Sequence, residues 1–236
     1  MICHKSKVIY IHIPKCAGSS IENYFGVHPF DWKTPNYETL TGWCPKRKIH
    51  LQHATAKQLL ELELVDEKIW NSYYKFTVVR NPWERILSAY FWFNGNKVIK
   101  SSFRNFLNKE GLYKKTLTDF SVKEYRGDHL LSQYEFITIN DQIMVDKIIP
   151  FENLKIDFFE LVKNLGLTSF ELPHRKERKK AVSHYSHFFN GEDIELIKDK
   201  YSLDIQMLKY KYEDKRNELS TFEKFKINFG RLTHRI

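Results

Sequence analysis

The sequence has few cysteines, and they are not arranged for cross-linking or for zinc. Only Cys3, Cys16 and Cys44 occur, and they show no paired spacing such as C-x-x-C. An odd, sparse set argues against a disulfide-stabilised scaffold and fits a reducing compartment. No spacing of cysteine and histidine typical of a zinc site is present. We therefore expect neither a disulfide framework nor a metal.

Long apolar segments are also missing. The first residues, MICHKSKVIY, lack the apolar core of a signal peptide. No run reaches the roughly 18 apolar residues that could form a membrane-spanning helix. Internal repeats and low-complexity tracts do not occur either. These absences favour a cytoplasmic protein.

The sequence does contain enough apolar residues for a core, and it has an excess of positive charge. Its 236 residues, 42% of them hydrophobic, suit one domain with a sizeable interior. The net charge of +9 favours a polyanionic partner such as nucleic acid, an anionic glycan, acidic lipid or a highly charged nucleotide. A generally basic surface would give the same value, so charge alone does not choose.

Apolar runs at residues 8–13, 48–53 and 75–79 predict strands that alternate with helices. Helices are expected at 20–25, 55–64, 66–72, 82–95, 151–165 and from 190 onward. Such alternation predicts an α/β fold with a central, mostly parallel sheet flanked by helices. We expect a single domain over residues 1–212, followed by a charged C-terminal helix or tail over 213–236.

The first motif is the stretch from Lys7 to Phe25, KVIYIHIPKCAGSSIENYF. A buried strand leads into a tight turn and then into a helix, whose first N–H groups and dipole attract an anion. Lys15 supplies a positive charge, and Gly18 lets the backbone come close. Ser19 and Ser20 add hydroxyl donors. The stretch therefore predicts an anion pocket, although an ordinary helix start could have the same residues.

The position of the lysine differs from that in the usual NTP-binding loop. In that loop the lysine follows the last glycine and precedes a Ser or Thr that holds magnesium. Here Lys15 precedes Gly18. We therefore expect a phosphate-like anion held by Lys15 and the backbone, without a dedicated magnesium ligand.

The second motif, FTVVRNPWERILSAY, covers residues 76–90. Arg80 lies at the carboxyl end of its strand, where ligands bind in open α/β sheets. Ser88 follows about two helical turns later, so the two could bind one phosphate together, with Arg85 as a third candidate. Alternatively, Arg85 joins Glu84 on a solvated face, and Ser88 is a small packing residue.

Together, I-P-K-C-A-G-S-S and V-V-R-N-P-W-E-R-I-L-S-A-Y resemble the two nucleotide-binding segments of sulfotransferases. These enzymes use 3′-phosphoadenosine 5′-phosphosulfate (PAPS). The most similar group contains carbohydrate sulfotransferases of the heparan 2-O type and their bacterial relatives. VDKIIPFENL at residues 145–154 and the pattern from Tyr201 to Tyr210 extend the resemblance over most of residues 7–212. The resemblance implies a P-loop-like, three-layer fold.

The resemblance also implies roles for the matching residues. The 5′-phosphosulfate of PAPS would be bound by Lys15, Cys16, Ala17, Gly18, Ser19 and Ser20. Arg80 and Ser88 would bind the 3′-phosphate. Sulfuryl transfer depends on positioning and charge stabilisation, and Lys15 would stabilise or protonate the bridging oxygen of the leaving phosphate. No metal is expected in this chemistry.

The acceptor hydroxyl needs a base, and two residues are candidates. His53, in HLQHATA, follows a predicted strand, and the similar family has a basic histidine in a comparable place. Imidazole suits this role near neutral pH, although His53 could instead cap a helix or pack. Glu22 is the rival, because other sulfotransferases use a glutamate. His50 is a weaker candidate, and His12 is expected to be structural.

The resemblance implies two partners, a nucleotide co-substrate and a carbohydrate or other hydroxyl acceptor, with no nucleic acid. The basic segment at residues 173–186 could close over the nucleotide, attract an anionic acceptor or simply be solvated. Two alternative functions stay open, a P-loop kinase or NTPase and a non-catalytic polyanion-binding module. The sequence favours no particular oligomeric state.

Overall fold

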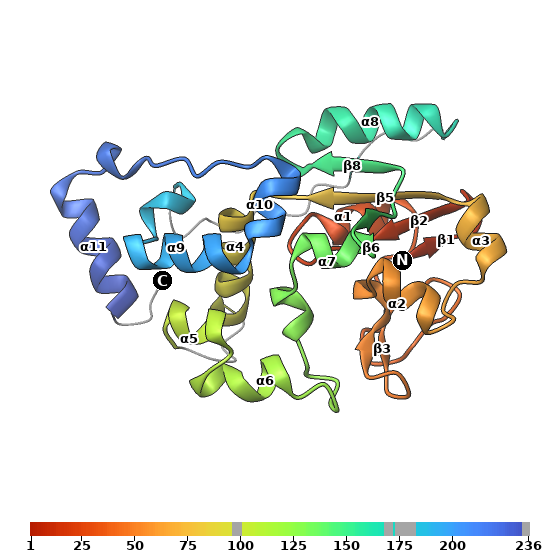
Figure 1. Ribbon diagram of the computed structural model, residues 1–236, viewed down its shortest axis with the longest axis horizontal. Coiled ribbons are helices and arrows are strands. Elements are labelled where there is room, and N and C mark those ends of the chain that lie inside the picture. Colours follow the sequence, from red (N-terminus) through yellow and green to blue (C-terminus); the bar gives the residue numbers. More distant parts are fainter. Residues whose placement is uncertain (96–100, 168–171, 173–182, 233–236) are drawn as a thin grey trace. The chain divides into compact units, whose positions relative to one another are not determined.

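The computed structural model describes residues 1–95, 101–167, 172 and 183–232. The chain divides into two compact units, which we describe separately (Figure 1). The first unit contains Met1–Arg80 and Phe120–Arg175, and the second contains Asn81–Asp119 and Lys176–Ile236. The single domain expected over residues 1–212 stays a prediction.

A four-stranded sheet forms the centre of the first unit (Figure 1). Its strands, in spatial order, are β1 (Ile2–Cys3), β2 (Val8–Ile11), β5 (Tyr74–Val79) and β8 (Lys147–Pro150). Strands β2, β5 and β8 are parallel, whereas β1 pairs with β2 in the antiparallel direction. All four residues of β2 are buried, as expected of a strand covered on both faces. The central, mostly parallel sheet is confirmed.

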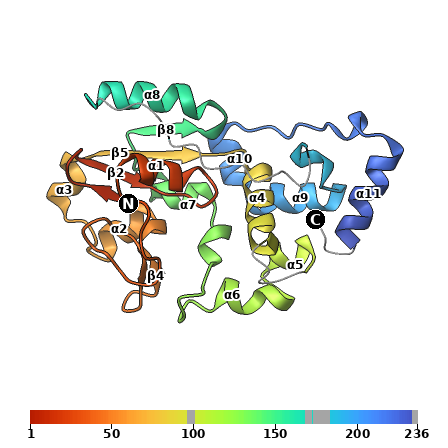
Figure 2. The same ribbon diagram turned by 180° about the vertical axis from the view of Figure 1, so that it is seen from behind.

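Helices flank this sheet, with α7 (Gln133–Ile137) on the near side in Figure 1 and α1 (Gly18–Tyr24) on the near side of the reversed view in Figure 2. On one face, α8 (Leu154–Asn164) places Phe158 beside the end of α1 and beside β5. The Phe158 ring lies 5.0 Å from that of Tyr24 and 6.2 Å from that of Phe76, between centroids. Phe158 is fully buried, and burial of such a side chain contributes roughly 1.5–3 kcal/mol.

Local signals in the sequence predict several helix starts correctly. Helix α2 (Ala56–Glu61) begins with a capping box between Thr55 and Gln58. Asp66 caps α3 (Glu67–Ser72) by accepting a 2.7 Å hydrogen bond from the Ile69 N–H. Helix α1 begins at Gly18, two residues before its predicted start.

The segment 48–53 differs from the expectation. Only Ile49–His50 forms a strand, β4, and it pairs with β3 (Trp43–Cys44) in a separate two-stranded sheet. Lys48 adopts a φ of 55° in the turn between these strands, and Leu51–His53 forms a 3-10 turn. The tight turn and the early 3-10 turn stop the strand after two residues, so it does not join the central sheet.

A short hairpin turns at Asn140-Asp141. Strands β6 (Thr138–Ile139) and β7 (Gln142–Ile143) pair in the antiparallel direction. Asn140 and Asp141 both have positive φ, 48° and 62°. Asn and Asp tolerate this region better than most residues, and a two-residue hairpin turn requires it.

The second unit is helical where the structure describes it. Its helices are α4 (Pro82–Gly95), α5 (Phe103–Asn108), α6 (Lys114–Thr118), α9 (Gly191–Lys200), α10 (Ser202–Leu208) and α11 (Thr221–Leu232). Aromatic rings fill its core, chiefly those of Tyr90, Phe93, Phe103, Phe106, Tyr113, Phe188 and Phe189. The described residues contain no helix that is both long and apolar enough to cross a membrane.

Candidate functional site

The predicted anion turn lies between β2 and α1. Lys15 and Ala17 both have positive φ, 71° and 60°, and Ala17 is the N-cap residue of α1. Because alanine has no side-chain oxygen to cap the helix, the first N–H groups of α1 suit an external acceptor. Lys15, Ser19 and Ser20 are half-buried. The turn therefore has the backbone form of an anion site with polar side chains at hand.

The structure shows a reason for glycine at position 18 that the sequence does not indicate. A Cβ atom at this position would lie 1.7 Å from Nε2 of His12. Glycine is therefore required because the His12 ring packs directly against the start of α1. His12, which directly follows β2, is thus buried against the first turn of α1.

Glu22, the rival base, is engaged with the same histidine. Its Oε1 lies 2.8 Å from Nδ1 of His12, and Glu22 is only 1% exposed. Burial raises the pKa of Glu22, but the His12 ring outweighs this effect and holds the pKa below its ordinary value. The pKa of His12 is lowered, mainly by burial and against the pull of Glu22. A buried carboxylate held in this way is poorly placed to take a proton from an acceptor.

Gln133, a residue without an assigned role in the sequence, joins the two predicted motifs. Its Oε1 accepts a 2.8 Å hydrogen bond from the Arg80 N–H, and its Nε2 donates one of 2.8 Å to the Arg80 carbonyl. The Cys16 thiol lies 3.7 Å from the same Oε1. Nη1 of Arg80 also donates to the Lys15 carbonyl, at 3.3 Å. The turns that follow β2 and β5 are thus held together by direct hydrogen bonds.

The two residues expected at the 3′-phosphate fall in different units. The guanidinium of Arg80 lies 4.3 Å from the centroid of the Phe151 ring in the first unit. Ser88 is half-buried on α4 in the second, and its pairing with Arg80 on one phosphate stays a prediction. Arg85 is fully buried, with its guanidinium 5.4 Å from the centroid of the Tyr201 ring. The alternative that placed Arg85 on a solvated face is therefore wrong.

His53, the favoured base, forms a short hydrogen bond with Asp128 through Nδ1. Asp128 is 7% exposed. Burial raises the pKa of this carboxyl, but His53 outweighs it, so that the pKa of Asp128 lies below its ordinary value. An ionised carboxylate can only accept, so Nδ1 carries the proton and the lone pair of Nε2 is left for another group. This is the arrangement of an oriented general base.

Three more histidine rings surround His53. Ring centroids lie 4.8 Å away for His12, 5.5 Å for His129 and 6.2 Å for His50. The pKa of His129 lies well below its ordinary value, mainly through burial, and the charge of Lys15 contributes to the lowering. Lys15 therefore acts electrostatically on the histidine cluster, which links the anion turn to the base.

His53 and two neighbours could also hold a metal ion. Donor atoms of His53, Asp128 and His129 all lie within 4.8 Å of one another. Two imidazole nitrogens and a carboxylate oxygen suit a zinc-like ion. The sequence does not indicate a metal site here, because Asp128 and His129 are distant from His53 along the chain.

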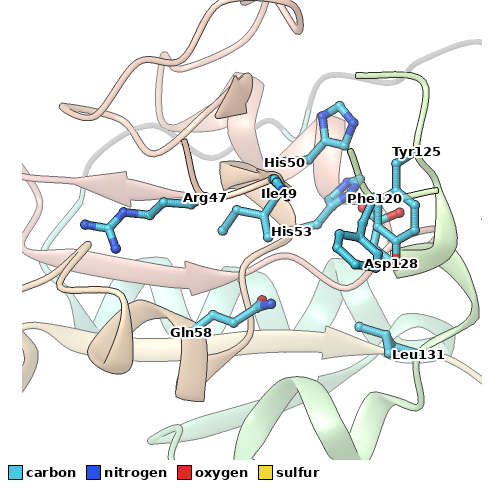
Figure 3. Close-up of a pocket in the computed structure, with 10 residues that line it drawn as sticks. Arg47, Ile49, His50, His53, Gln58, Phe120, Tyr125, Asp128 and Leu131 are labelled. Atoms are coloured by element: carbon cyan, nitrogen blue, oxygen red, sulfur yellow. Dashed lines mark hydrogen bonds and ion pairs between the residues drawn. The ribbon is translucent and has the colours of Figure 1, made fainter. Parts of the chain in front are cut away.

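A pocket of about 310 Å³ opens beside this cluster (Figure 3). It is lined by Arg47, Lys48, Ile49, His50, His53, Gln58, Phe120, Tyr125, Asp128 and Leu131. In Figure 3, His53, Phe120, Tyr125 and Asp128 gather at one end, and the Arg47 side chain extends away from them. Lys48 Nζ lies 5.7 Å from the centroid of the Phe120 ring. The pocket thus combines the candidate base with aromatic and cationic walls.

The basic segment 173–186 is described only in part. Residues 173–182 of the basic segment lie outside the described residues. In the aromatic segment 26–47, the Trp32 side chain is 38% exposed. The Arg126 guanidinium lies 5.1 Å from the centroid of the Trp32 ring.

The chain is similar to known proteins over much of its length. The model of the Sulfotransferase family matches residues 1–211. An uncharacterized protein of Archaeoglobus fulgidus is 30% identical over 105 residues, which cover 44% of this chain and 76% of that protein. A crystal structure of a sulfotransferase from Alicyclobacillus acidocaldarius is 15% identical, with a TM-score of 0.39, and the match covers 87% of this chain and 96% of that chain. Because the family model spans most of its length, this chain belongs to the sulfotransferase family.

Proposed function

We propose that this sulfotransferase moves the sulfuryl group of PAPS to a hydroxyl of a carbohydrate bound in the 310 Å³ pocket. The observation that carries the proposal is the partly buried His53–Asp128 hydrogen bond at that pocket. Asp128 fixes the tautomer of His53, and the charge of Lys15 acts on the neighbouring His129. A base and a cation for the leaving group thus belong to one connected cluster.

In the proposed reaction, His53 Nε2 takes the proton of the acceptor hydroxyl. The acceptor oxygen then forms a bond to sulfur as the bond between sulfur and the bridging phosphate oxygen breaks, in line. Asp128 stabilises the positive charge that develops on the imidazole. The products are a sulfate ester, adenosine 3′,5′-bisphosphate and a proton that His53 later releases to solvent.

Lys15 and the anion turn act on the leaving group. The bridging oxygen gains negative charge as the bond to sulfur breaks, and preoriented cations and N–H groups stabilise such charge. In this proposal the 5′-phosphosulfate lies on Lys15–Ser20, with Lys15 facing the bridging oxygen. Arg80 binds the 3′-phosphate.

The walls of the pocket support a carbohydrate acceptor. Phe120 and Tyr125 offer aromatic faces, and Gln58 offers an amide for a hydroxyl. A cavity of this size is at the small end of the usual range for ligand sites, roughly 300–1,000 Å³. One or two sugar rings match this combination of size, aromatic surface and polar groups.

Two measurements test the proposal. In a transfer assay, labelled PAPS is offered with a panel of glycans, lipids and small alcohols, and we expect label in a glycan. Calorimetry in EDTA is expected to detect binding of adenosine 3′,5′-bisphosphate but not of ATP. Binding of ATP with magnesium and hydrolysis of its γ-phosphate would instead support the kinase or NTPase alternative.

A further inference from the structure

Helix α11 presents three phenylalanine side chains to solvent. Phe222, Phe225 and Phe229 are 65%, 67% and 49% exposed. Their spacing of three and four residues places them on one side of the helix. The rings of Phe225 and Phe229 stack, with centroids 6.4 Å apart. A contiguous exposed aromatic face of this kind marks an interaction surface.

Another side of the helix is less exposed. Gly230 is buried, and Ile227 is half-buried. On a helical wheel these two residues lie away from the three phenylalanines. The exposed aromatic face and the less exposed side of α11 are therefore distinct.

The charges of α11 are mainly basic. The helix contains Lys224, Lys226 and Arg231 against a single acid, Glu223. Glu223 accepts hydrogen bonds from the N–H and hydroxyl of Ser220, at 2.9 and 2.7 Å, and so caps the helix start. Glu223 is thus engaged at the helix start, and the net charge of α11 is positive.

Lys226 lies at the edge of the aromatic face. Its Nζ is 4.4 Å from the centroid of the Phe222 ring. A lysine in this position covers apolar surface with its stem and can keep its ammonium group in water or against an anion. A face of phenylalanines with a lysine at its edge, on a helix of net positive charge, matches a helix that lies in the interface of a membrane.

We propose that α11 binds the surface of a membrane that contains anionic lipids. Phe222, Phe225 and Phe229 insert at the boundary of headgroups and acyl chains, while Lys224 and Lys226 contact lipid phosphates. A second copy of the chain fits this face less well, since a symmetric contact would place Lys226 near its own counterpart. This inference does not depend on the proposed reaction.

Vesicle co-sedimentation with the full chain tests the proposal. The probes are vesicles of phosphatidylcholine alone and vesicles with one third phosphatidylglycerol. We expect at least tenfold tighter binding to the anionic vesicles, and weaker binding as salt is raised. Replacement of Phe222, Phe225 and Phe229 by Ser should reduce that binding at least tenfold. Lys224→Glu with Lys226→Glu should reduce binding to anionic vesicles by a similar factor.

A matched control uses another helix with exposed apolar residues. Ile156 and Phe159 on α8 are 61% and 42% exposed, and Ile156→Ser with Phe159→Ser should bind like wild type. Circular dichroism checks the fold of each variant, and the lysine variant tests the proposal even if the phenylalanine variant does not fold. Absence of binding by wild type, or equal loss in the α8 control, would overturn the proposal. Concentration-dependent dimers that only the α11 phenylalanines support, without vesicle binding, would assign this face to a second copy instead.

Discussion

His53 donates a hydrogen bond through Nδ1 to the carboxylate of Asp128, a residue 75 positions further along the chain. This contact joins the 3-10 turn before α2 to the 3-10 turn Gly127–Leu130. The hydrogen bond orients His53, the base predicted from the sequence, through Asp128, which has no predicted role. The proposed reaction depends on this pair.

Asp128→Asn is expected to lower kcat by roughly 10²–10⁴-fold, the usual contribution of a positioned acid–base group. The amide no longer carries the charge that stabilises the imidazolium, and it allows the wrong tautomer of His53. Steady-state kinetics with PAPS and the identified acceptor measure the effect. Asp141→Asn, at an exposed hairpin carboxylate that accepts from Tyr134, is the control. Equal kcat values for the two variants would exclude the role of Asp128.

Gly18→Ala is expected to unfold the anion turn or to destabilise the protein by several kcal/mol, because its Cβ would overlap His12. Removal of the ring should relieve the overlap, so His12→Ala with Gly18→Ala should be more stable than Gly18→Ala alone. Urea denaturation measures both values. Gly191→Ala, with open space around its Cβ, should have little effect. A Gly18→Ala protein as stable as wild type would contradict the packing of His12 on α1.

Gln133→Leu is expected to raise KM for PAPS more than it lowers kcat. The change leaves the N–H and carbonyl of Arg80 without the bonds that Gln133 makes, and each buried unpaired group costs about 1–3 kcal/mol. Gln52→Leu is a matched control, because Gln52 is also buried and accepts a hydrogen bond from the Gly42 N–H at 2.9 Å. It should lose stability without a comparable rise in KM. Equal rises in KM would mean that Gln133 acts only through stability.

Acid should destabilise the protein through its buried histidines. Burial, with a smaller effect of Arg126, lowers the pKa of His50 to about 4. The unfolded histidine has a pKa near 6.5 and binds its proton first, so stability that is fully present above pH 6.5 is lost as the pH falls toward 4. We expect His50 to account for roughly 3 kcal/mol of this loss. The pKa values of His12 and His129 are lowered too, and they add to the same trend.

The free energy of unfolding in urea at pH 7 and pH 4.5 measures this dependence. His50→Gln removes the titrating group, so its stability should fall less over the same interval. An equal fall in wild type and His50→Gln would show that His50 does not titrate with a lowered pKa.

The sequence predicts those features of the fold that are determined locally. The apolar residues of β2 and β5, the capping box at Thr55 and the turn at Asn140-Asp141 each depend on neighbours in the chain. The segment 48–53 has the composition of a strand, but the turn at Lys48 and the 3-10 turn Leu51–His53 leave only Ile49–His50 as a strand. The apolar pattern does not indicate where such turns interrupt a strand.

The candidate site was predictable only in part. Lys15, Arg80 and His53 follow or flank apolar segments, so their positions near strand ends can be predicted from the sequence. Asp128 and Gln133 lie in no recognisable motif, and only folding brings them to His53 and Arg80. Their roles follow from burial and hydrogen bonding, which no spacing along the chain reveals.

The central claim is that His53 is the base for sulfuryl transfer from PAPS, and transfer by two variants tests it most directly. His53→Ala and Glu22→Gln are compared with wild type for movement of label from PAPS to the acceptor, and calorimetry with adenosine 3′,5′-bisphosphate verifies the nucleotide site in each. We predict that His53→Ala loses at least 100-fold in kcat and retains its affinity for the nucleotide, whereas Glu22→Gln that still folds keeps most of its transfer rate. Full transfer by His53→Ala, or its loss in Glu22→Gln alone, would contradict the assignment of the base.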